Sequence, residues 1–273
     1  MDNGSRNSIG NNKMKIITLL TDFGSFYPAQ MKGVILSRLG EKARDVTFVD
    51  IAHDIPPQDV RAGAFALLSS ARFFPPGTIH IGVVDPDVGT ERLGLVVESG
   101  GQIFVGPDNG LLMPAARSLG TPGNPLQAYK IAISLEALGQ AYPASNTFHG
   151  RDVFAPVAAL LASGKSPAGI GPPVRPKNLN FGEAKKTDRG IEATVIYVDR
   201  FGNLILNMRK VPAFPVSLKG IKLRHVGTYA QARRIEPLIT LGSHGFAEIA
   251  VNQGNAAEAF CLKAGDRIEL EEI

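Results

Sequence analysis

The sequence lacks tryptophan and contains a single cysteine, Cys261. One cysteine can form neither an intrachain disulfide nor a thiolate metal cluster, which excludes a disulfide scaffold and a Cys-rich metal module. No histidine or other base lies beside Cys261 in the sequence, so we expect a buried, unreactive thiol rather than a nucleophile. No apolar run approaches the roughly 20 residues of a membrane-spanning helix, which argues against a membrane protein.

The sequence also lacks a large excess of either charge. It has 29 lysines and arginines and 25 aspartates and glutamates, which gives a formal net charge of +4. The charges are scattered and form no Lys/Arg run of the nucleic-acid-binding kind, so a mildly basic, solvated surface is the simpler interpretation. The first 14 residues are polar and lack the apolar core of a signal peptide. We therefore expect a disordered tail at 1–14 and a cytoplasmic protein with neither a nucleic-acid nor a membrane partner.

Between residues 15 and 170, short apolar segments rich in β-branched residues alternate with segments of helical periodicity. Strands are expected at 15–20, 46–51 and 79–84, with helices at 31–39, 60–74, 111–119 and 153–162. Two further strands flank Ser99–Gly100–Gly101 as a predicted hairpin. The alternation predicts a mainly parallel sheet with crossover helices, which we interpret as a Rossmann-like N-terminal α/β domain at 15–170.

The segment from 163 to 186 is rich in proline and glycine, which is typical of a linker or an extended crossing. Beyond it, short apolar segments recur without a strong helix between them. Strands are expected there at 192–198, 204–207, 238–241, 246–251 and 267–270. Closely spaced strands predict a small β-sandwich or barrel. The expected organisation is a linker at 171–190 and a C-terminal β-barrel domain at 191–273.

Polar side chains at strand ends are the first candidates for chemistry. Asp85 follows the apolar, β-branched segment 79–84 at a strand end, where open α/β sheets bind ligands, and Arg92 follows Asp85 after a tight turn. His149 stands just before a predicted helix. An Asp, an Arg and a His are sufficient to orient and activate a water molecule. The structural alternatives are a surface ion pair for Asp85 and Arg92 and a solvated loop position for His149.

Other turns carry groups suited to binding. Asp22, at the end of the first strand, can accept hydrogen bonds from both hydroxyls of a ribose, or it can simply close an Asx turn. The turns at 199–203 (DRFGN) and 243–246 (SHGF) are consistent either with a binding surface or with ordinary β-turns. His53 is expected to satisfy backbone groups at a strand end. The phosphate-binding motif GxGxxG is absent, which argues against a pyrophosphate cofactor.

In this order, the motifs resemble those of the S-adenosylmethionine (SAM) hydroxide adenosyltransferase family, relatives of the fluorinating and chlorinating enzymes. The resemblance extends from about residue 15 to the C-terminus. It is carried by LLTDFG at 19–24, MKG at 31–33, DIAHDIPPQDVRAGAF at 50–65, FFPPGTIHIGVVDPDVGTER at 73–92, FVGPDNGLL at 104–112, TFHGRDVFAP at 147–156, DRFGN at 199–203 and LGSHGFAEIAVNQGNAA at 241–257.

The resemblance implies that Asp85, Arg92 and His149 are a catalytic triad. In hydroxide-using members this triad orients a water that attacks the ribose 5′ carbon of SAM and gives adenosine and methionine. We therefore expect Asp85 and His149 to bind that water and accept its proton. The implied substrate-binding residues are Asp22 at the ribose, Asp199 at the methionine ammonium, Ser243 near the carboxylate, Phe201, Asn203 and Tyr229 around the adenine, and His244 where halogenases have arginine. The family also implies no cofactor, no metal ion, and a homotrimer with active sites at subunit interfaces.

Three features depart from the family pattern. Asp87 replaces a glycine, the loop 25–30 is shorter and lacks an acidic residue, and His244 replaces the arginine of the halogenases. Gly150 stands where halogenases have a hydroxyl residue, and this and the missing tryptophan favour water over halide. The leading hypothesis is a metal-independent SAM hydrolase. The alternatives are a halide-using adenosyltransferase and a non-catalytic protein that binds SAM or adenosine.

Overall fold

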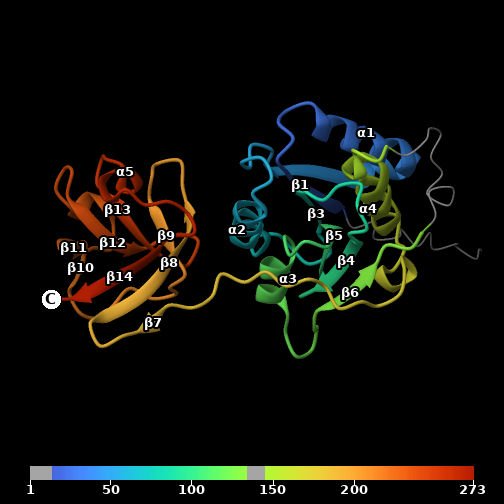
Figure 1. The fold of residues 1–273 in the computed structure, drawn as a ribbon. Coiled ribbons are helices and arrows are strands. Elements are labelled where there is room, and N and C mark those ends of the chain that lie inside the picture. The colour runs from blue at the N-terminus through green and yellow to red at the C-terminus, as the bar shows by residue number, and fades with distance from the viewer. Residues whose placement is uncertain (1–13, 134–144) are drawn as a thin grey trace, which may run out of the picture. The chain divides into compact units, whose positions relative to one another are not determined.

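The computed structural model describes residues 14–133 and 145–273, so the predicted tail lies outside the described residues except for Met14. The chain divides into two compact units, Met1–Asn178 and Leu179–Ile273, here called unit 1 and unit 2 (Figure 1). The finer domain and linker limits given above stay predictions. Among the described residues, no helix is long and apolar enough to cross a membrane.

Unit 1 contains one sheet of six strands with helices on both faces. Its strands are β1 (Lys15–Thr21), β2 (Val46–Ala52), β3 (Ile79–Val83), β4 (Gly94–Ser99), β5 (Gln102–Pro107) and β6 (Gln127–Lys130). Its α-helices are α1 (Tyr27–Leu39), α2 (Val60–Ala71), α3 (Met113–Leu119) and α4 (Ala155–Ala162). The strand order is β2-β1-β3-β5-β4-β6. β2, β1, β3 and β5 are parallel, whereas β4 runs antiparallel to both of its neighbours, so the sheet is mixed.

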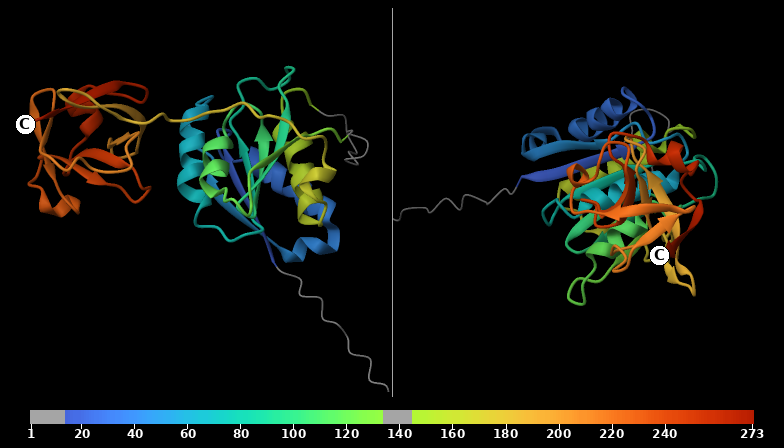
Figure 2. Two further views of the ribbon diagram at one scale, coloured as in Figure 1. Left: turned by 90° about the horizontal axis from the view of Figure 1, so that it is seen from below. Right: turned by 90° about the vertical axis from the view of Figure 1, so that its left-hand side faces the viewer.

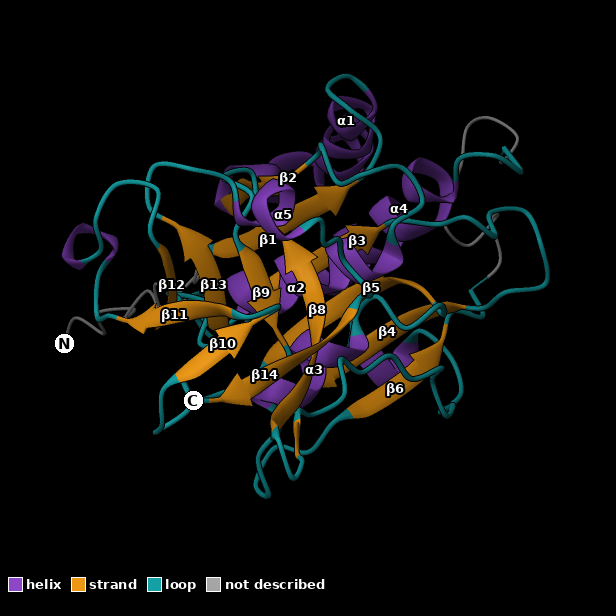
Figure 3. Cartoon of the chain, turned by 60° about the vertical axis from the view of Figure 1, so that its left-hand side comes forward, coloured by secondary structure: helices purple, strands orange, loops and turns teal. Residues whose placement is uncertain are grey.

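Helices cover both faces of the central strands (Figures 1 and 3). Ile17 and Leu19 of β1 pack with residues of α1 and α4 on one face of the sheet. Because successive strand residues point to opposite faces, Leu20 lies on the other face, toward α2. There α2 approaches so closely that a Cβ on Gly63 would lie 2.8 Å from Leu111 Cδ1 and 3.5 Å from Leu20 Cδ2. This close packing keeps the sheet rigid behind the strand ends that carry the candidate residues.

A buried histidine joins three strands of this sheet. His80 Nδ1 lies 2.7 Å from Thr18 Oγ1, and its Nε2 lies 2.9 Å from Gln102 Oε1. The Gln102 amide donates to the carbonyl oxygens of Ala71 and Phe74, so its Oε1 is the acceptor for His80. Nε2 of His80 therefore carries the proton and Nδ1 accepts from Thr18. Burial lowers the pKa of His80 to about 4, although the hydrogen bond to Gln102 acts in the opposite direction and raises this pKa.

We expect His80 to make the protein less stable in mild acid. Its folded-state pKa of about 4 lies below the ordinary value of 6.5, so its contribution is fully present above pH 6.5. That contribution is lost as the pH falls from 6.5 toward 4, and it amounts to about 3 kcal/mol over this window. Urea unfolding of the wild type and of His80→Gln between pH 6.5 and 4 measures this loss of stability, with His225→Gln as the control. Equal pH slopes for the wild type and His80→Gln would contradict it.

The proline- and glycine-rich crossing is bound to both units over most of its length. Backbone hydrogen bonds join Lys130 to Pro172 and Val174 to Ala128, so the crossing runs along β6. The Lys177 N–H donates to Asp108 Oδ1 at 2.7 Å. In unit 2, the Ala184 N–H donates to the Asn207 carbonyl, and the Asn207 amide donates to the Phe181 carbonyl. The division between the units falls after Asn178, between these two sets of bonds.

Unit 2 is a closed β-barrel (Figure 2). Its strands are β7 (Lys185–Lys186), β8 (Gly190–Val198), β9 (Leu204–Leu206), β10 (Val216–Leu218), β11 (Ile221–His225), β12 (Pro237–Leu241), β13 (Ala247–Val251) and β14 (Arg267–Glu272), with one short helix, α5 (Ala256–Phe260). Seven strands form the ring β14-β10-β11-β12-β13-β9-β8, which the pairing of β14 with β8 closes, and β7 pairs outside the ring. The predicted C-terminal barrel is confirmed.

The sequence did not reveal β10, β11 or α5. β10 and β11 form a hairpin around Lys219 and Gly220, which have φ of 53° and 76°. Two positive φ angles are typical of a type I′ turn, for which Lys-Gly is a weaker signal than Asn-Gly. Cys261 was expected to be buried, but it is exposed. It ends α5 in a left-handed conformation with φ of 49°.

Candidate active site

The sheet of unit 1 brings three candidate side chains to one edge. Asp22 follows β1 and Asp85 follows β3, and these strands are parallel neighbours with Thr21 opposite Val83. Arg92 precedes β4, which runs antiparallel to β5. The start of an antiparallel strand lies at the same edge as the ends of its parallel neighbours. The antiparallel hairpin therefore places Arg92 beside Asp85.

Asp85 and Arg92 form a buried, bidentate ion pair. Arg92 Nε lies 2.9 Å from Asp85 Oδ1 and 3.0 Å from Oδ2, and Arg92 Nη2 also donates to Oδ2. Both side chains are only 4% exposed, and the guanidinium carbon lies 5.3 Å from the centre of the Phe154 ring. The surface ion pair considered from the sequence is therefore wrong. A bidentate pair away from bulk water is stronger and more precisely oriented than a surface pair.

His149 completes a hydrogen-bonded set with these two residues. Arg92 Nη2 lies 2.8 Å from His149 Nδ1. A guanidinium can only donate, so Nδ1 accepts and is unprotonated. A neutral imidazole then carries its proton on Nε2, which can donate to a further group. Burial and the charge of Arg92 lower the pKa of His149, and Asp85 and Asp152 oppose that shift. His149 is therefore half-buried, neutral and oriented by Arg92.

The backbone around His149 is fixed by a buried carboxylate. His149 immediately precedes a π-helical turn, Gly150–Phe154, which continues into α4. Asp152 in this turn is fully buried and accepts hydrogen bonds from the Ser145 N–H and from its neighbour Arg151. Single π-helical turns inside α-helices occur frequently at functional sites. From the sequence we expected only an α-helix starting at Val153.

Asp22 is oriented by the chain that follows β2. Its Oδ2 accepts a hydrogen bond of 2.8 Å from the N–H of Gln58, a residue with φ of 66°. His53 lies nearby, but it does not act on backbone groups as we expected. Its Nδ1 lies 2.9 Å from Thr21 Oγ1 and its Nε2 lies 3.0 Å from Asp50 Oδ1. His53 therefore joins two side chains, and Asp22 remains a candidate at the carboxyl edge of the sheet.

Two departures from the family pattern have simple local explanations. Asp87 is exposed and does not have positive φ, so it adopts its conformation without backbone strain. Gly89 is the residue of this turn with positive φ, 81°, and a Cβ there would lie 2.6 Å from the Asn146 carbonyl oxygen. Most of the short segment 25–30 is the first turn of α1, which contains Pro28.

An aromatic group that the sequence did not single out borders His149. The Phe148 ring centre lies 5.5 Å from that of Phe23 and 5.2 Å from that of Tyr27, both in edge-to-face contact. The Phe26 ring centre lies 4.0 Å from that of Tyr27, and Phe26 is 60% exposed. Stacked and edge-to-face rings hold one another in place. This group gives the edge of unit 1 a partly exposed apolar face beside the Asp–Arg–His set.

Unit 2 gathers the remaining candidate residues in one pocket of about 550 Å³. The predicted residues that line it are Asp199, Phe201, Asn203, Tyr229, Ser243 and His244. Asp199 Oδ1 accepts from the N–H groups of Phe201 and Asn203, and its Oδ2 accepts from the Asn203 side-chain amide. Asp199 thus builds the turn and also lines the pocket, so the turn is confirmed and the binding role stays a prediction. The Phe201 ring is 75% exposed.

Glu248 on β13 also lines this pocket, and sequence reasoning did not find it. It accepts a hydrogen bond from the Tyr229 hydroxyl, and its Oε2 lies 3.0 Å from His244 Nε2. Burial, then the hydrogen bond and charge of Glu248, and last the charge of Asp199, raise the pKa of Tyr229. The pocket therefore contains a buried acid connected to two of its predicted residues.

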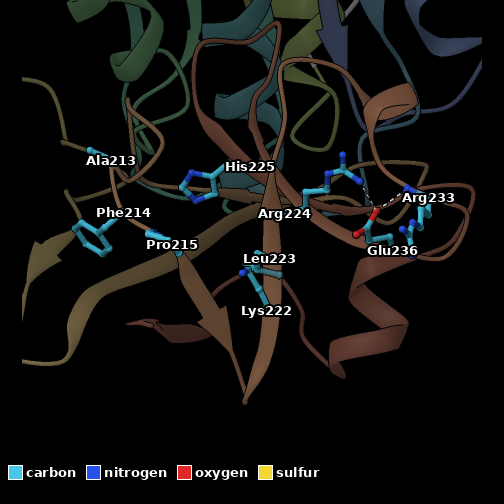
Figure 4. A pocket seen from close by; sticks show the side chains of 9 residues that line it. All are labelled: Ala213, Phe214, Pro215, Lys222, Leu223, Arg224, His225, Arg233 and Glu236. Carbon is cyan, nitrogen blue, oxygen red and sulfur yellow. Dashed lines mark hydrogen bonds and ion pairs between the residues drawn. The ribbon is translucent and has the colours of Figure 1, made fainter.

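A second cavity of unit 2, of about 650 Å³, is lined by residues of β11 and the segments next to it (Figure 4). Lys222, Arg224 and Arg233 line it together with Glu236, which accepts from Arg224 Nη1 at 3.2 Å. None of the predicted site residues lies here. Among the described residues, no group of three His, Cys, Asp or Glu side chains is arranged to hold a metal ion.

Comparisons with known proteins find similarity over both units. The SAM hydroxide adenosyltransferase N-terminal domain matches residues 17–171, and the C-terminal domain of the same name matches residues 193–269. The (R)-S-adenosyl-L-methionine hydrolase of Thermus thermophilus is 38% identical over 263 residues, covering 94% of this chain and all of that protein. A fluorinase of Nocardia brasiliensis is 26% identical over 305 residues, covering 96% of this chain and 98% of that protein.

Among solved structures, an uncharacterized conserved protein from Thermotoga maritima superposes with a TM-score of 0.79 and 32% identity, covering 93% of this chain and 99% of that one. The two family matches together span both units from Ile17 to Glu269 apart from residues 172–192. The chain therefore belongs to the SAM hydroxide adenosyltransferase family.

Proposed function

We propose that this protein is a SAM hydrolase that converts SAM and water into adenosine and L-methionine. A water oxygen forms a bond to the ribose 5′ carbon, and the bond from that carbon to sulfur breaks. The electron pair goes to sulfur, which leaves as the neutral thioether of methionine, and one proton is released. The proposal is supported by family membership and by the 38% identity to a protein named as a SAM hydrolase.

The observation that carries the proposal is the hydrogen-bonded set of Asp85, Arg92 and His149, in which the ion pair is buried. The sulfonium is already a good leaving group, so the protein mainly has to desolvate and position the water in line with it. The Asp85 carboxylate accepts a hydrogen bond and then the proton from the water. His149, neutral and held through Nδ1, donates from Nε2 to the water oxygen. Arg92 fixes both groups and stabilises the negative charge of Asp85.

This assignment gives His149 a narrower role than the sequence suggested. From the sequence we expected both Asp85 and His149 to accept the proton of the water. With Nδ1 occupied by Arg92, the neutral imidazole has no acceptor left for the water, so Asp85 is the proton acceptor. No cofactor or metal ion is needed in this scheme, because carboxylate, guanidinium and imidazole supply all the acid–base groups.

The substrate-binding roles follow the resemblance described above. Asp22 would accept from the ribose hydroxyls, Asp199 would bind the methionine ammonium, and Ser243 would lie near the carboxylate. His244 would stand where halogenases have arginine. Phe201, Asn203 and Tyr229 would hold the adenine. We propose a homotrimer in which SAM binds between unit 1 of one copy and unit 2 of the next. In support, unit 1 holds the Asp–Arg–His set and unit 2 holds the pocket. Light scattering should give three times the mass of the chain.

The Rossmann-like description of unit 1 and the cytoplasmic location belong to the same proposal. Four parallel strands with helices on both faces support the first. The second rests on the sequence alone.

Incubation of the purified protein with SAM in halide-free buffer tests the function. Chromatography should show adenosine and methionine rising together with time, in equal amounts. A bound adenosyl ligand without product would instead support the non-catalytic alternative. Product that forms only when chloride or fluoride is added would support a halide-using transferase.

Gly150 distinguishes water from halide as the nucleophile. A Cβ here would lie 3.1 Å from Phe148, 3.2 Å from Phe23 and 3.3 Å from Met31, so the space is already filled by side chains. We expect Gly150→Ser to cost about 1–3 kcal/mol of stability through overpacking and to produce no halogenated nucleoside in chloride buffer. Urea unfolding and chromatography measure the two effects. Gly123→Ser is the matched control, because nothing lies within 4 Å of its Cβ. A chlorinated product from Gly150→Ser would contradict the expectation.

A further inference from the structure

The pocket of unit 2 is lined by negative charge, although the whole chain carries a formal charge of +4. Asp199 and Glu248 line it, and none of its described lining residues is lysine or arginine. The second cavity of the same unit has the opposite character, with Lys222, Arg224 and Arg233 against the single acid Glu236 (Figure 4). The distribution of charge within unit 2 therefore differs sharply from one cavity to the other.

Glu248 is held firmly in the wall of this pocket. It is 3% exposed, accepts from the Tyr229 hydroxyl, and lies 3.0 Å from His244 Nε2. The Phe246 N–H donates to His244 Nδ1 at 3.2 Å, so the proton of a neutral His244 is on Nε2 and points to Glu248. Two donors, the Tyr229 hydroxyl and His244 Nε2–H, thus face the carboxylate and hold it in place.

The turn before β13 is shaped so that this contact can form. A Cβ on Gly242 would lie 2.4 Å from Glu248 Oε2 and 2.5 Å from His244 Nε2. Any other residue at this position would push the imidazole and the carboxylate apart. Glycine at this position leaves room for the buried contact between His244 and Glu248. This indicates that the contact is a built part of the pocket wall.

The size of the pocket determines how strongly these charges act on a ligand. A volume of about 550 Å³ corresponds to a sphere roughly 10 Å across, so any charge bound inside lies within about 10 Å of both carboxylates. At an effective dielectric constant of about 20, one such pair of unit charges changes affinity roughly tenfold. Charge, and not only shape, should therefore decide which ligands the pocket accepts.

We propose that Glu248 makes this pocket selective for adenosyl ligands with a positive charge at the position of sulfur, over neutral thioethers of the same shape. This inference rests on the proposed function, because it concerns how the same site recognises SAM. SAM carries a sulfonium, whereas neither product does, since methionine has a neutral sulfur and adenosine has none. The same carboxylate would thus favour binding of the substrate over retention of the products.

Two stable analogues test the selectivity without turnover. Sinefungin has an ammonium-bearing carbon in place of the sulfonium, and S-adenosylhomocysteine has a neutral thioether. Titration calorimetry of each analogue with the full-length protein gives the ratio of the two dissociation constants. We expect the wild type to prefer sinefungin, and Glu248→Gln to reduce that preference roughly tenfold. The matched control is Glu192→Gln on β8, an exposed residue outside the pocket, which should leave the ratio unchanged.

A second variant separates charge from positioning. Tyr229→Phe removes a hydrogen bond to Glu248 but keeps the carboxylate. It should weaken both analogues by a similar factor and leave their ratio within about twofold of the wild type. If Glu248 acted only by holding Tyr229 and His244 in place, Glu248→Gln would also weaken both analogues equally. That result would overturn the inference.

The wild type alone also decides the matter if Glu248→Gln fails to fold. Equal affinity of the wild type for the two analogues would overturn the proposed selectivity.

SAM hydrolysis, measured on the same preparations, separates failure of this inference from failure of the proposed function. Hydrolysis combined with an unchanged ratio in Glu248→Gln would leave the proposed function intact and show that the role of Glu248 is wrong. Absence of both binding and hydrolysis would show that the proposed function itself is wrong.

Discussion

Asp85→Asn and His149→Ala are each expected to lower the turnover of SAM by about 10²–10⁴-fold, because positioned acid–base groups contribute this much to catalysis. Asparagine keeps the shape of Asp85 but cannot accept the proton of the water. Alanine at 149 removes the Nε2–H that is available to orient the water. Both effects fall on the chemical step, so kcat should fall and the binding of sinefungin should change little.

The measurement is the initial rate of adenosine formation, with sinefungin titrations on the same samples. His225→Ala is the matched control for His149, since its pKa is also lowered by burial but it lies at the β11 cavity of unit 2 (Figure 4). Its turnover should equal that of the wild type. Wild-type turnover in both Asp85→Asn and His149→Ala would show that the set is structural and that other groups activate the water.

The sequence was sufficient to predict how unit 1 presents Asp85. The segment before it is mainly apolar and rich in β-branched residues, which predicts a buried parallel strand, and ligands bind at the ends of such strands. The glycine pair at 100–101 predicts the hairpin whose antiparallel strand starts beside Asp85. Local patterns thus specified the strands and the turn, and the neighbouring position of Asp85 and Arg92 follows from them.

The features of the site that could not be predicted from the sequence depend on contacts between distant segments of the chain. The hydrogen bond from Arg92 to His149 joins residues 57 positions apart, and it alone fixes the tautomer of His149 and the direction of its free N–H. The π-helical turn after His149 has no sequence signature that differs from the start of an α-helix. Prediction therefore found the members of the set but assigned His149 a proton-accepting role that its geometry disfavours.

Glu248 was missed for a different reason. It alternates with Ala247 and Ile249, which pack in the barrel core, so the strand pattern places Glu248 on the outer face. An acid on the outer face of a strand is normally solvated and needs no explanation. Here the loop with Tyr229 and the turn with His244 cover that face, and neither can be placed against β13 without the folded structure.

Replacing Arg92 with methionine is expected to affect both stability and the pH dependence of activity. Removing one partner of a buried ion pair typically costs about 3–5 kcal/mol, because the remaining charge is left without compensation. Asp85 and Arg92 are each only 4% exposed, so this estimate applies to them with little correction for solvent. The free energy of unfolding from urea titrations should fall by that amount, and turnover should fall at least 10²-fold because neither Asp85 nor His149 stays oriented.

The pH profile makes this prediction specific. The charge of Arg92 is one of the causes that lower the pKa of His149, whereas Asp85 and Asp152 raise it. Without Arg92 the pKa of His149 rises, and more of the imidazole is protonated at neutral pH. The protonated ring would pair with Asp85, so the decline of kcat in acid should begin at a higher pH in Arg92→Met than in the wild type.

Arg92→Lys is the control that keeps the positive charge. The acid limb of its kcat profile should stay closer to that of the wild type, while its turnover falls because the bidentate geometry is lost. An acid limb at the same pH in all three proteins would mean that Arg92 does not control the protonation of His149. The hydrogen-bonded set would then not act as one unit in the reaction.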